Sequence, residues 1–354
     1  MRTLVLALCA LGLGAGGAHA ADPAAIMTGK PSGTYIQFGH DVAGLAKRFD
    51  LDLAVQPSAG SLENVEAVLK RPNTQLGIVQ SDVLDFVASF SDDPDLRYTA
   101  SKLRMVFPLY NEEVHILARP GVETLADLQG RRVAVGAPNS GTLLTATLLL
   151  ATANVVPGEE IRIDTDDALR ALRQGQVDAM FYIAGQPARI FAEDVTAEDN
   201  FHLVPVTDPA VADLYPSATI QAGAYPWLKE EVPTVAVRAV LMAYDYSKPT
   251  WYQRQACAAV GKVARIIHDN LDRLRRPGYG HPKWQQVDLD ADLVSWERSK
   301  CAEDGLKGPT SYVLQAEGTD CGAEDNAIRR KLCLVKQQML QQARQPVASA
   351  SRVM

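Results

Sequence analysis

The chain has 354 residues, of which 47% are hydrophobic and 22% are charged, and its formal net charge is −7. This length suffices for two domains with complete cores, and the composition is that of an ordinary globular protein. No basic patch or basic tail is present, so we expect no nucleic acid among its partners. A negative net charge does not exclude an anionic ligand, because a binding site is a local feature.

The first twenty residues have the pattern of a cleavable secretory signal. Arg2 gives a positive start, Leu4–Leu13 is a short apolar stretch, and residues 18–20 (Ala-His-Ala) match an A-x-A cleavage site. The alternatives are a buried N-terminal helix and a lipoprotein anchored at Cys9, although Leu8 stands where a lipoprotein has a small residue. No later segment has the ~18 uninterrupted apolar residues that span a bilayer. We therefore expect a soluble protein that is exported to the periplasm.

Short apolar strands alternate with helical patterns in the first part of the mature chain. Ala54–Gln56 and Leu76–Val79 are predicted strands, and a polar turn and a helix follow each of them. Ser61 is the predicted N-cap of the first helix, which Pro72 ends, and the second helix is predicted over Val83–Phe90.

A polar break interrupts the next apolar stretch. Leu103–Leu109 and Val114–Ala118 are predicted as two strands, separated by Tyr-Asn-Glu-Glu at residues 110–113. We place a crossover between two lobes at this break, with Tyr110 and His115 beside it, and we interpret the paired glutamates as part of a linker.

The central part of the chain continues the alternation. Further strands are predicted over Arg131–Val135, Ile161–Thr165 and Val177–Ile183, and Asp166 or Asp167 caps a helix after the second of them. Such alternation predicts βαβ units and mainly parallel sheets.

Two later segments are also apolar. Val235–Leu241 fits either a buried strand or a helix, and Thr250–Leu274 has the spacing of an amphipathic helix. The chain changes character after Arg275, where charged residues, Gly, Pro and Cys become frequent.

The most informative turn is Gly-Ala-Pro-Asn-Ser-Gly-Thr at residues 136–142, between a predicted strand and a predicted helix. Free backbone N–H groups and the dipole at a helix N-terminus suit an anion, and Ser140 and Thr142 add hydroxyls. No Lys follows Gly141, so the turn is not a nucleotide P-loop, and no G-x-G-x-x-G fingerprint occurs. A small carboxylate fits this turn best, and a turn without a ligand is the alternative.

Three other turns have the same character. They are residues 33–35, residues 58–61 with Asn64 in the following helix, and residues 80–82. Ligands of open α/β sheets bind where strands end and helices begin, so four such turns in two regions predict a cleft between lobes. Each turn by itself also fits a purely structural role. The predicted ligand-binding residues are Gly33, Thr34, Tyr35, Ser58, Ser61, Asn64, Gln80, Ser81, Tyr110, His115, Asn139, Ser140, Gly141, Thr142, Gly185 and Gln186.

Catalytic signatures are missing from the sequence. There is no G-x-S-x-G elbow and no H-E-x-x-H, and the six histidines show no metal-ligand spacing. We therefore predict a binding protein that is not an enzyme and that has no cofactor and no metal site. Arg119, Arg162 and Arg189 are the arginines available to a carboxylate, but none of them lies in the four turns.

Four cysteines remain once the signal is removed: Cys257, Cys301, Cys321 and Cys333. An even number in an oxidising compartment favours disulfides. Three connectivities are open, of which we favour Cys257–Cys301 with Cys321–Cys333. A zinc site is the alternative, although no C-x-x-C pair is present.

Five motifs carry a family resemblance, and they are Ser-Gly-Thr-Tyr at 32–35, residues 58–64, residues 76–82, Leu109-Tyr110 with His115, and residues 125–142. In this order they resemble the TAXI solute-binding proteins, the extracytoplasmic receptors of a subclass of TRAP transporters. The resemblance spans Gly29–Tyr244. The cysteine-containing tail after Arg275 departs from the family pattern.

The resemblance implies an α/β, type II periplasmic-binding-protein-like fold, in which two α/β lobes with mainly parallel sheets are joined by a hinge. It implies that the lobes close on a small organic anion, glutamate-like or a dicarboxylate, and that the closed receptor docks on a TRAP transporter membrane permease. Residues 21–110 and 216–275 would form lobe I, residues 111–215 lobe II, and residues 276–354 a C-terminal extension. We expect a monomer. A periplasmic ligand sensor and a secreted enzyme on the same fold are the alternatives.

Overall fold

The computed structural model describes residues 24–31, 33–314 and 331, which fall into two units. The first unit runs to Gly308, and the second starts at Pro309. The predicted signal at residues 1–20 lies outside the described residues, as do Cys321 and Cys333. Within the described part of the chain, no helix has both the length and the hydropathy of a membrane span.

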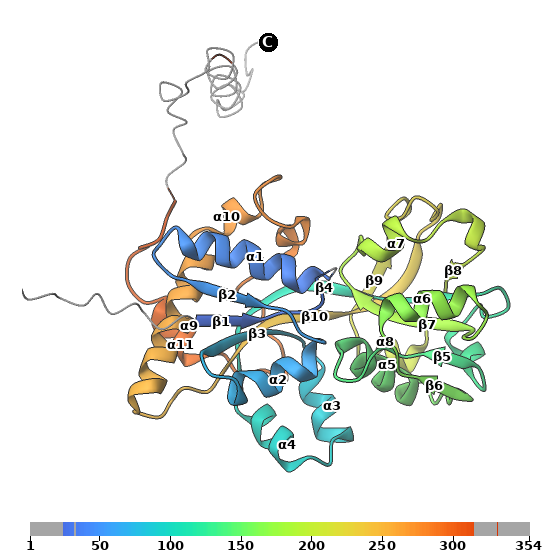
Figure 1. Cartoon of the computed structure of the whole chain (residues 1–354), viewed down its shortest axis with the longest axis horizontal. Coiled ribbons are helices and arrows are strands. Elements are labelled where there is room, and N and C mark those ends of the chain that lie inside the picture. Colours follow the sequence, from blue (N-terminus) through green and yellow to red (C-terminus); the bar gives the residue numbers. More distant parts are fainter. Residues whose placement is uncertain (1–23, 32, 315–330, 332–354) are drawn as a thin grey trace, which may run out of the picture. The chain divides into compact units, whose positions relative to one another are not determined.

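The first unit is built on one mixed sheet with the strand order β2-β1-β3-β10-β4-β7-β5-β6, in which β8 also pairs with β4 and β9 with β10 (Figure 1). Strands that precede helices pair in parallel, as β1 does with β2 and β3, and β5 with β6 and β7. The strands are β1 Ala24–Met27, β2 Leu53–Gln56, β3 Thr74–Gln80, β4 Leu103–Ala118, β5 Arg132–Ala134, β6 Glu159–Ile161, β7 Ala179–Ala184, β8 His202–Leu203, β9 Ser217–Ile220 and β10 Val232–Tyr244.

The long antiparallel strands β4 and β10 divide this sheet into two lobes. Residues 103–113 of β4 pair with residues 236–244 of β10, which also pairs with β3. Beyond this stretch, residues 113–118 of β4 pair with β7, and residues 232–235 of β10 pair with β9. Lobe I therefore surrounds β1, β2 and β3, and lobe II surrounds β5, β6 and β7 (Figure 1). The predicted α/β class with two lobes is confirmed, but the sheet is mixed and not mainly parallel, because β4 and β10 run antiparallel to their neighbours.

Helices lie on both sides of the strands in each lobe (Figure 1). Those of lobe I are α1 Thr34–Lys47, α2 Ser61–Lys70, α3 Val83–Phe90, α4 Pro94–Ser101, α9 Trp251–Asp269, α10 Leu271–Leu274, η3 Pro282–Gln286 and α11 Lys300–Gly305. Those of lobe II are η1 Leu125–Leu128, α5 Gly141–Thr152, α6 Thr165–Arg173, α7 Arg189–Glu193, η2 Ala197–Asp199 and α8 Pro209–Ala212.

Strand β4 is continuous, whereas the sequence predicted two strands and a linker. Glu112 and Glu113 both pair with β10, so β4 continues through the polar break, although the register of the ladder shifts between the pairs Asn111–Arg238 and Pro108–Val240. Each glutamate is only 3% exposed. A buried carboxylate needs a hydrogen-bond or charge partner, and Tyr35 supplies one to Glu112 while Lys283 supplies one to Glu113. The acidic pair is therefore part of the crossover strand.

Two predicted helix starts also differ from the structure. Gly60, at φ 130°, is the residue before α2, so Ser61 is the first helical residue and its hydroxyl accepts from the Gln80 N–H. Helix α6 starts after Asp164, whose carboxylate accepts from the Asp167 N–H at 3.0 Å. Asp167 is thus the donor of this cap, and not its acceptor.

Residues 276–308 pack within the first unit, although the sequence grouped residues 276–354 as one extension. Helix α11 packs against α9, where a Cβ on Gly305 would lie 2.3 Å from the Gly261 carbonyl oxygen. The same two helices carry Cys257 and Cys301, which form a disulfide. The predicted Cys257–Cys301 bridge is confirmed.

Candidate ligand-binding site

A cavity of about 90 Å³ lies between the two lobes, at a point where four helices begin. The starts of α1 and α2 line it from lobe I, and the starts of α5 and α6 line it from lobe II. The carboxyl ends of β3 and β7 complete its wall, together with Glu112 of β4. A buried water needs roughly 10–15 Å³, so the cavity accommodates several waters or a small organic molecule.

Half of the predicted ligand-binding residues line this cavity. Every one of the four turns identified in the sequence contributes to the wall, so the structure brings together segments that lie far apart along the chain. The predicted residues that line it are Gly33, Thr34, Tyr35, Ser61, Gln80, Ser140, Gly141 and Thr142.

The two lobes touch at the starts of α2 and α5. A Cβ on Gly60 would lie 3.1 Å from the Gly141 backbone nitrogen, and a Cβ on Gly141 would lie 2.2 Å from the Gln80 side-chain oxygen. The Leu62 N–H donates to the carbonyl oxygen of Asn139 at 3.2 Å across the same contact. Gly60 has a φ of 130°, which favours glycine, and a side chain at Gly141 would displace the side chains of Gln80 and Ser61. The structure is thus a closed arrangement of the lobes.

Three backbone N–H groups at this contact have no acceptor among the described residues. They belong to Ser61 at the start of α2 and to Gly141 and Thr142 at the start of α5. The first N–H groups of a helix lack partners within the helix and carry the positive end of its dipole. Because the groups come from different lobes, they form an anion site that only the closed arrangement assembles.

The two hydroxyls of the α5 turn differ in their availability. The Ser140 hydroxyl donates to the Ala137 carbonyl at 2.7 Å and accepts from the Leu143 N–H at 3.1 Å, so it serves as the cap of α5. The Thr142 hydroxyl accepts from the Ile183 N–H at 3.3 Å, and its own proton is left for a ligand. The turn therefore offers backbone N–H groups and one hydroxyl, with Ser140 shaping them.

Gln80 and Asp82 connect the lobes beneath the cavity. The Thr145 hydroxyl of α5 lies 3.3 Å from the Gln80 side-chain oxygen and 2.9 Å from Asp82, which also accepts from the Tyr215 hydroxyl at 3.1 Å. Burial raises the pKa of Asp82 to about 7. These bonds join lobe I to side chains of lobe II.

The other predicted residues do not line the cavity, and two of them support its wall. The Ser58 hydroxyl donates to Asn64 at 2.7 Å, and the Asn64 amide donates to the carbonyls of Thr28 and Ile78 at 2.6 and 2.7 Å. These bonds hold α2 against β1 and β3. The predicted residues outside the lining are Ser58, Asn64, Ser81, Tyr110, His115, Asn139, Gly185 and Gln186.

His115 lies in the core of lobe II, fully buried. Its Nδ1 is 2.8 Å from the Glu113 carbonyl oxygen, which only accepts, so Nδ1 carries the proton and Nε2 accepts from the Tyr225 hydroxyl at 2.7 Å. Burial lowers the pKa of His115 to about 4. The imidazole is therefore a neutral bridge between β4 and Tyr225.

Several lining residues were missed by the sequence analysis, and Glu112 is the most informative of them. Its carboxylate accepts from the Tyr35 hydroxyl at 2.8 Å, and burial raises its pKa to about 8. An acidic pair inside a long apolar stretch, Leu103–Ala118, is the signal that would have found it. Tyr182 also lines the cavity.

Other missed residues place charges around the cavity. Lys30 of lobe I forms an ion pair with Asp164 of lobe II at 3.3 Å, and Asp166 lies in the first turn of α6. The cavity lining contains no arginine among the described residues. In the same part of the chain, no group of three or more His, Cys, Asp or Glu side chains is arranged to hold a metal ion.

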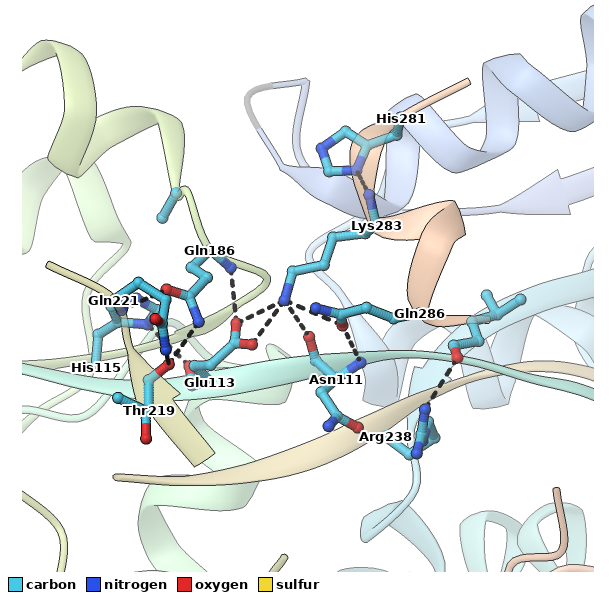
Figure 2. A network of polar contacts seen from close by, with 12 residues as sticks. Asn111, Glu113, His115, Gln186, Thr219, Gln221, Arg238, His281, Lys283 and Gln286 are labelled. Carbon is cyan, nitrogen blue, oxygen red and sulfur yellow. Dashed lines mark hydrogen bonds and ion pairs between the residues drawn. The ribbon is translucent and has the colours of Figure 1, made fainter. Parts of the chain in front are cut away.

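A buried network lies beside the cavity, around Glu113 (Figure 2). Lys283 of η3 reaches both Glu113 carboxylate oxygens, at 2.6 and 2.9 Å, and the Asn111 carbonyl at 3.0 Å. Glu113 also accepts from the Gln186 N–H at 2.7 Å, and Gln186 in turn donates to the Thr219 carbonyl at 2.7 Å. The network joins the C-terminal segment of the first unit to the crossover strand and to lobe II.

Comparison with known proteins gives a family match and distant structural similarities. A family model described as the NMT1-like family matches residues 26–294. The periplasmic binding protein BugD is 12% identical with a TM-score of 0.47, and the match covers 91% of this chain and 96% of that one. MatC from Rhodopseudomonas palustris, with bound malate, is 20% identical with a TM-score of 0.42 over 75% and 94% of the two chains. Tv2483, bound to L-arginine, is 15% identical with a TM-score of 0.46 over 77% and 96%.

Proposed function

We propose that the chain, which belongs to the NMT1-like family, is an extracytoplasmic solute-binding receptor of a TRAP-type transporter of the TAXI subclass. It captures a small organic carboxylate in the periplasm and delivers it to the membrane permease. The observation that carries this proposal is the set of free N–H groups of Ser61, Gly141 and Thr142, which two lobes present to one cavity. The motif resemblance across Gly29–Tyr244 supports the transporter subclass.

Capture follows from the distribution of these donors between the lobes. A carboxylate bound to Gly141 and Thr142 gains the Ser61 N–H only when lobe I closes on lobe II, so the ligand stabilises the closed state by its differential contacts. Strands β4 and β10 are the two connections that absorb the motion. Both lobes come from one chain, so a single copy of the chain is enough to assemble the site.

The substitution Gly141→Ala tests the site. Its methyl group would lie 2.2 Å from Gln80 Oε1, so the lobes no longer close without displacing that side chain into the cavity. A thermal-shift screen of amino acids and of mono- and dicarboxylic acids first identifies the best ligand. Calorimetry with that ligand is expected to give at least tenfold weaker binding by the variant.

Gly44→Ala is the matched control, because nothing lies within 4 Å of a Cβ added there in α1. Its affinity is expected to equal that of the wild type. Equal affinity of the Gly141→Ala variant would refute the site. Mass spectrometry of ligand recovered after long incubation checks the receptor role, since a receptor returns its ligand with an unchanged mass.

A further inference from the structure

Glu112 lines the cavity and forms no ion pair among the described residues. Its carboxyl is 3% exposed, and the Tyr35 hydroxyl is its one hydrogen-bond donor within the described chain, at 2.8 Å. A carboxylate has about four acceptor positions, and its burial is costly when they are not filled. The raised pKa of Glu112 has burial as its first cause, followed by repulsion from Glu113 and Asp82. The cavity therefore contains an acidic group that no cation among the described residues contacts.

Aromatic rings and hydroxyls surround this carboxylate. Tyr35 and Tyr182 line the same cavity, and burial, followed by the nearby Glu112 carboxyl, raises the pKa of both phenols and of Tyr110. Tyr110 is fully buried, and its hydroxyl has no hydrogen-bond partner among the described residues. Tyrosine rings attract cations through their π faces. A carboxylate set among tyrosines is a suitable site for an ammonium group.

The other charges of the lining favour the same ligand. Three carboxyl groups, those of Glu112, Asp164 and Asp166, line the cavity with one cation, Lys30, which is already paired with Asp164. A second carboxylate on the ligand would find no unpaired cation among the described residues of this lining. A positive group on the ligand would instead pair with Glu112 as its carboxyl releases a proton.

We propose that the ligand is a zwitterion whose carboxylate lies on the N–H groups of α2 and α5 and whose ammonium group lies against Glu112. This inference rests on the proposed function and narrows it, since amino-acid-like molecules satisfy both ends and simple dicarboxylates satisfy one. Glu112 is the residue that selects the amine.

Calorimetry with matched pairs of probes tests the proposal. Each pair is an amino acid and the acid that lacks its amine: L-alanine with propionate, L-leucine with 4-methylpentanoate, L-glutamate with glutarate, and 4-aminobutyrate with butyrate. The wild type is expected to bind the best amino acid at least tenfold more tightly than its partner acid. In Glu112→Gln this preference is lost, because the affinity for the amino acid falls while that for the partner acid does not.

Glu66→Gln, an exposed position of α2, is the matched control and keeps the preference. Equal or tighter wild-type binding of the amine-free acids overturns the zwitterion proposal alone, and it does so without any variant. Retention of the preference by Glu112→Gln overturns the assignment to Glu112. Failure of every acid to bind, with or without an amine, overturns the proposed function as well.

Discussion

Glu112 and Glu113 are neighbours on the crossover strand, equally buried, and they have opposite surroundings. Successive side chains of a strand point away from each other, so the first carboxylate faces the cavity while the second enters the network of Figure 2. Glu113 has Lys283, which is 3% exposed and contacts both of its oxygens. Glu112 has a single phenol, that of Tyr35.

The difference separates a structural charge from a binding charge. The partner of Glu113 is supplied by the chain itself, 170 residues away, so the pair fixes the C-terminal segment against the crossover strand. Glu112 has no such partner in the described residues, and the place for one is the cavity. We therefore expect that removing the charge of Glu112 stabilises the protein, whereas removing the charge of Glu113 or of its partner Lys283 destabilises it.

Breaking the Glu113 pair has the largest expected effect. Lys283→Met leaves a buried carboxylate without its cation and lowers the free energy of unfolding by about 3–5 kcal/mol. Urea denaturation followed by circular dichroism measures the loss. Lys70→Met, which removes an exposed pair with Glu66, is expected to cost at most about 0.5 kcal/mol. If the free energy of unfolding of Lys283→Met lies within about 1 kcal/mol of the wild-type value, the ion pair of Glu113 does not distinguish it from Glu112, and the comparison fails.

The pH dependence of stability is a second test of the difference between Glu112 and Glu113, and we expect an effect of intermediate size. The pKa of Asp82 is raised to about 7 and that of Glu112 to about 8, so the folded protein holds protons that the unfolded chain releases. Stability without ligand therefore falls as pH rises from 6.5 to 8. His115 and His281, with pKa lowered to about 4, oppose this fall in its lower part without reversing it, because the unfolded chain still binds protons on these imidazoles near pH 6.5.

Removing the charge of Glu112 is expected to flatten that fall. Glu112→Gln should raise Tm at pH 8 by about 2–4 °C, the shift that about 1 kcal/mol produces in a domain of 150–250 residues. Differential scanning fluorimetry at constant ionic strength measures it. Glu113→Gln is the contrasting variant and lowers Tm, because Lys283 loses its partner. A wild-type Tm that rises with pH in this window would refute the raised pKa of both carboxyls.

Removing the Tyr35 hydroxyl has the smallest expected effect. Tyr35→Phe removes the one phenol that donates to Glu112, so ligand affinity measured by calorimetry is expected to fall by about tenfold or less, as for one hydrogen bond to a charged group. Tyr246→Phe is the control, since its hydroxyl donates to the Thr74 carbonyl away from the cavity. A complete loss of binding in Tyr35→Phe alone would mean that the phenol itself, and not Glu112, holds the ligand.

The sequence alone was sufficient for the fold class and for the four turns that meet at the cavity. Small and polar residues at the junction of a strand and a helix reveal such turns, because their backbone geometry limits the residues that fit. Local sequence patterns also predicted α2 and α3 as helices that follow short strands. Counting cysteines in a chain with a predicted export signal favoured disulfides and left three connectivities open, of which the preferred one contained the observed Cys257–Cys301 bridge.

The sequence could not supply pairings between distant segments. Glu113 resembled part of a polar linker because Lys283, which makes its burial tolerable, follows 170 residues later. Lys30 and Asp164 likewise meet only when the lobes close. Ser140 was expected to contact the ligand, and its hydroxyl instead caps α5, a use that depends on the Ala137 carbonyl nearby.

A crystal structure of the protein with its tightest-binding amino acid is the most direct test of how the two lobes bind a zwitterion. We predict that the ligand carboxylate lies within hydrogen-bond distance of the Ser61, Gly141 and Thr142 nitrogens. We predict that the ligand amine lies within hydrogen-bond distance of the Glu112 carboxylate. A ligand that leaves Glu112 without a cation, or that places its carboxylate on Lys30 instead, would contradict it.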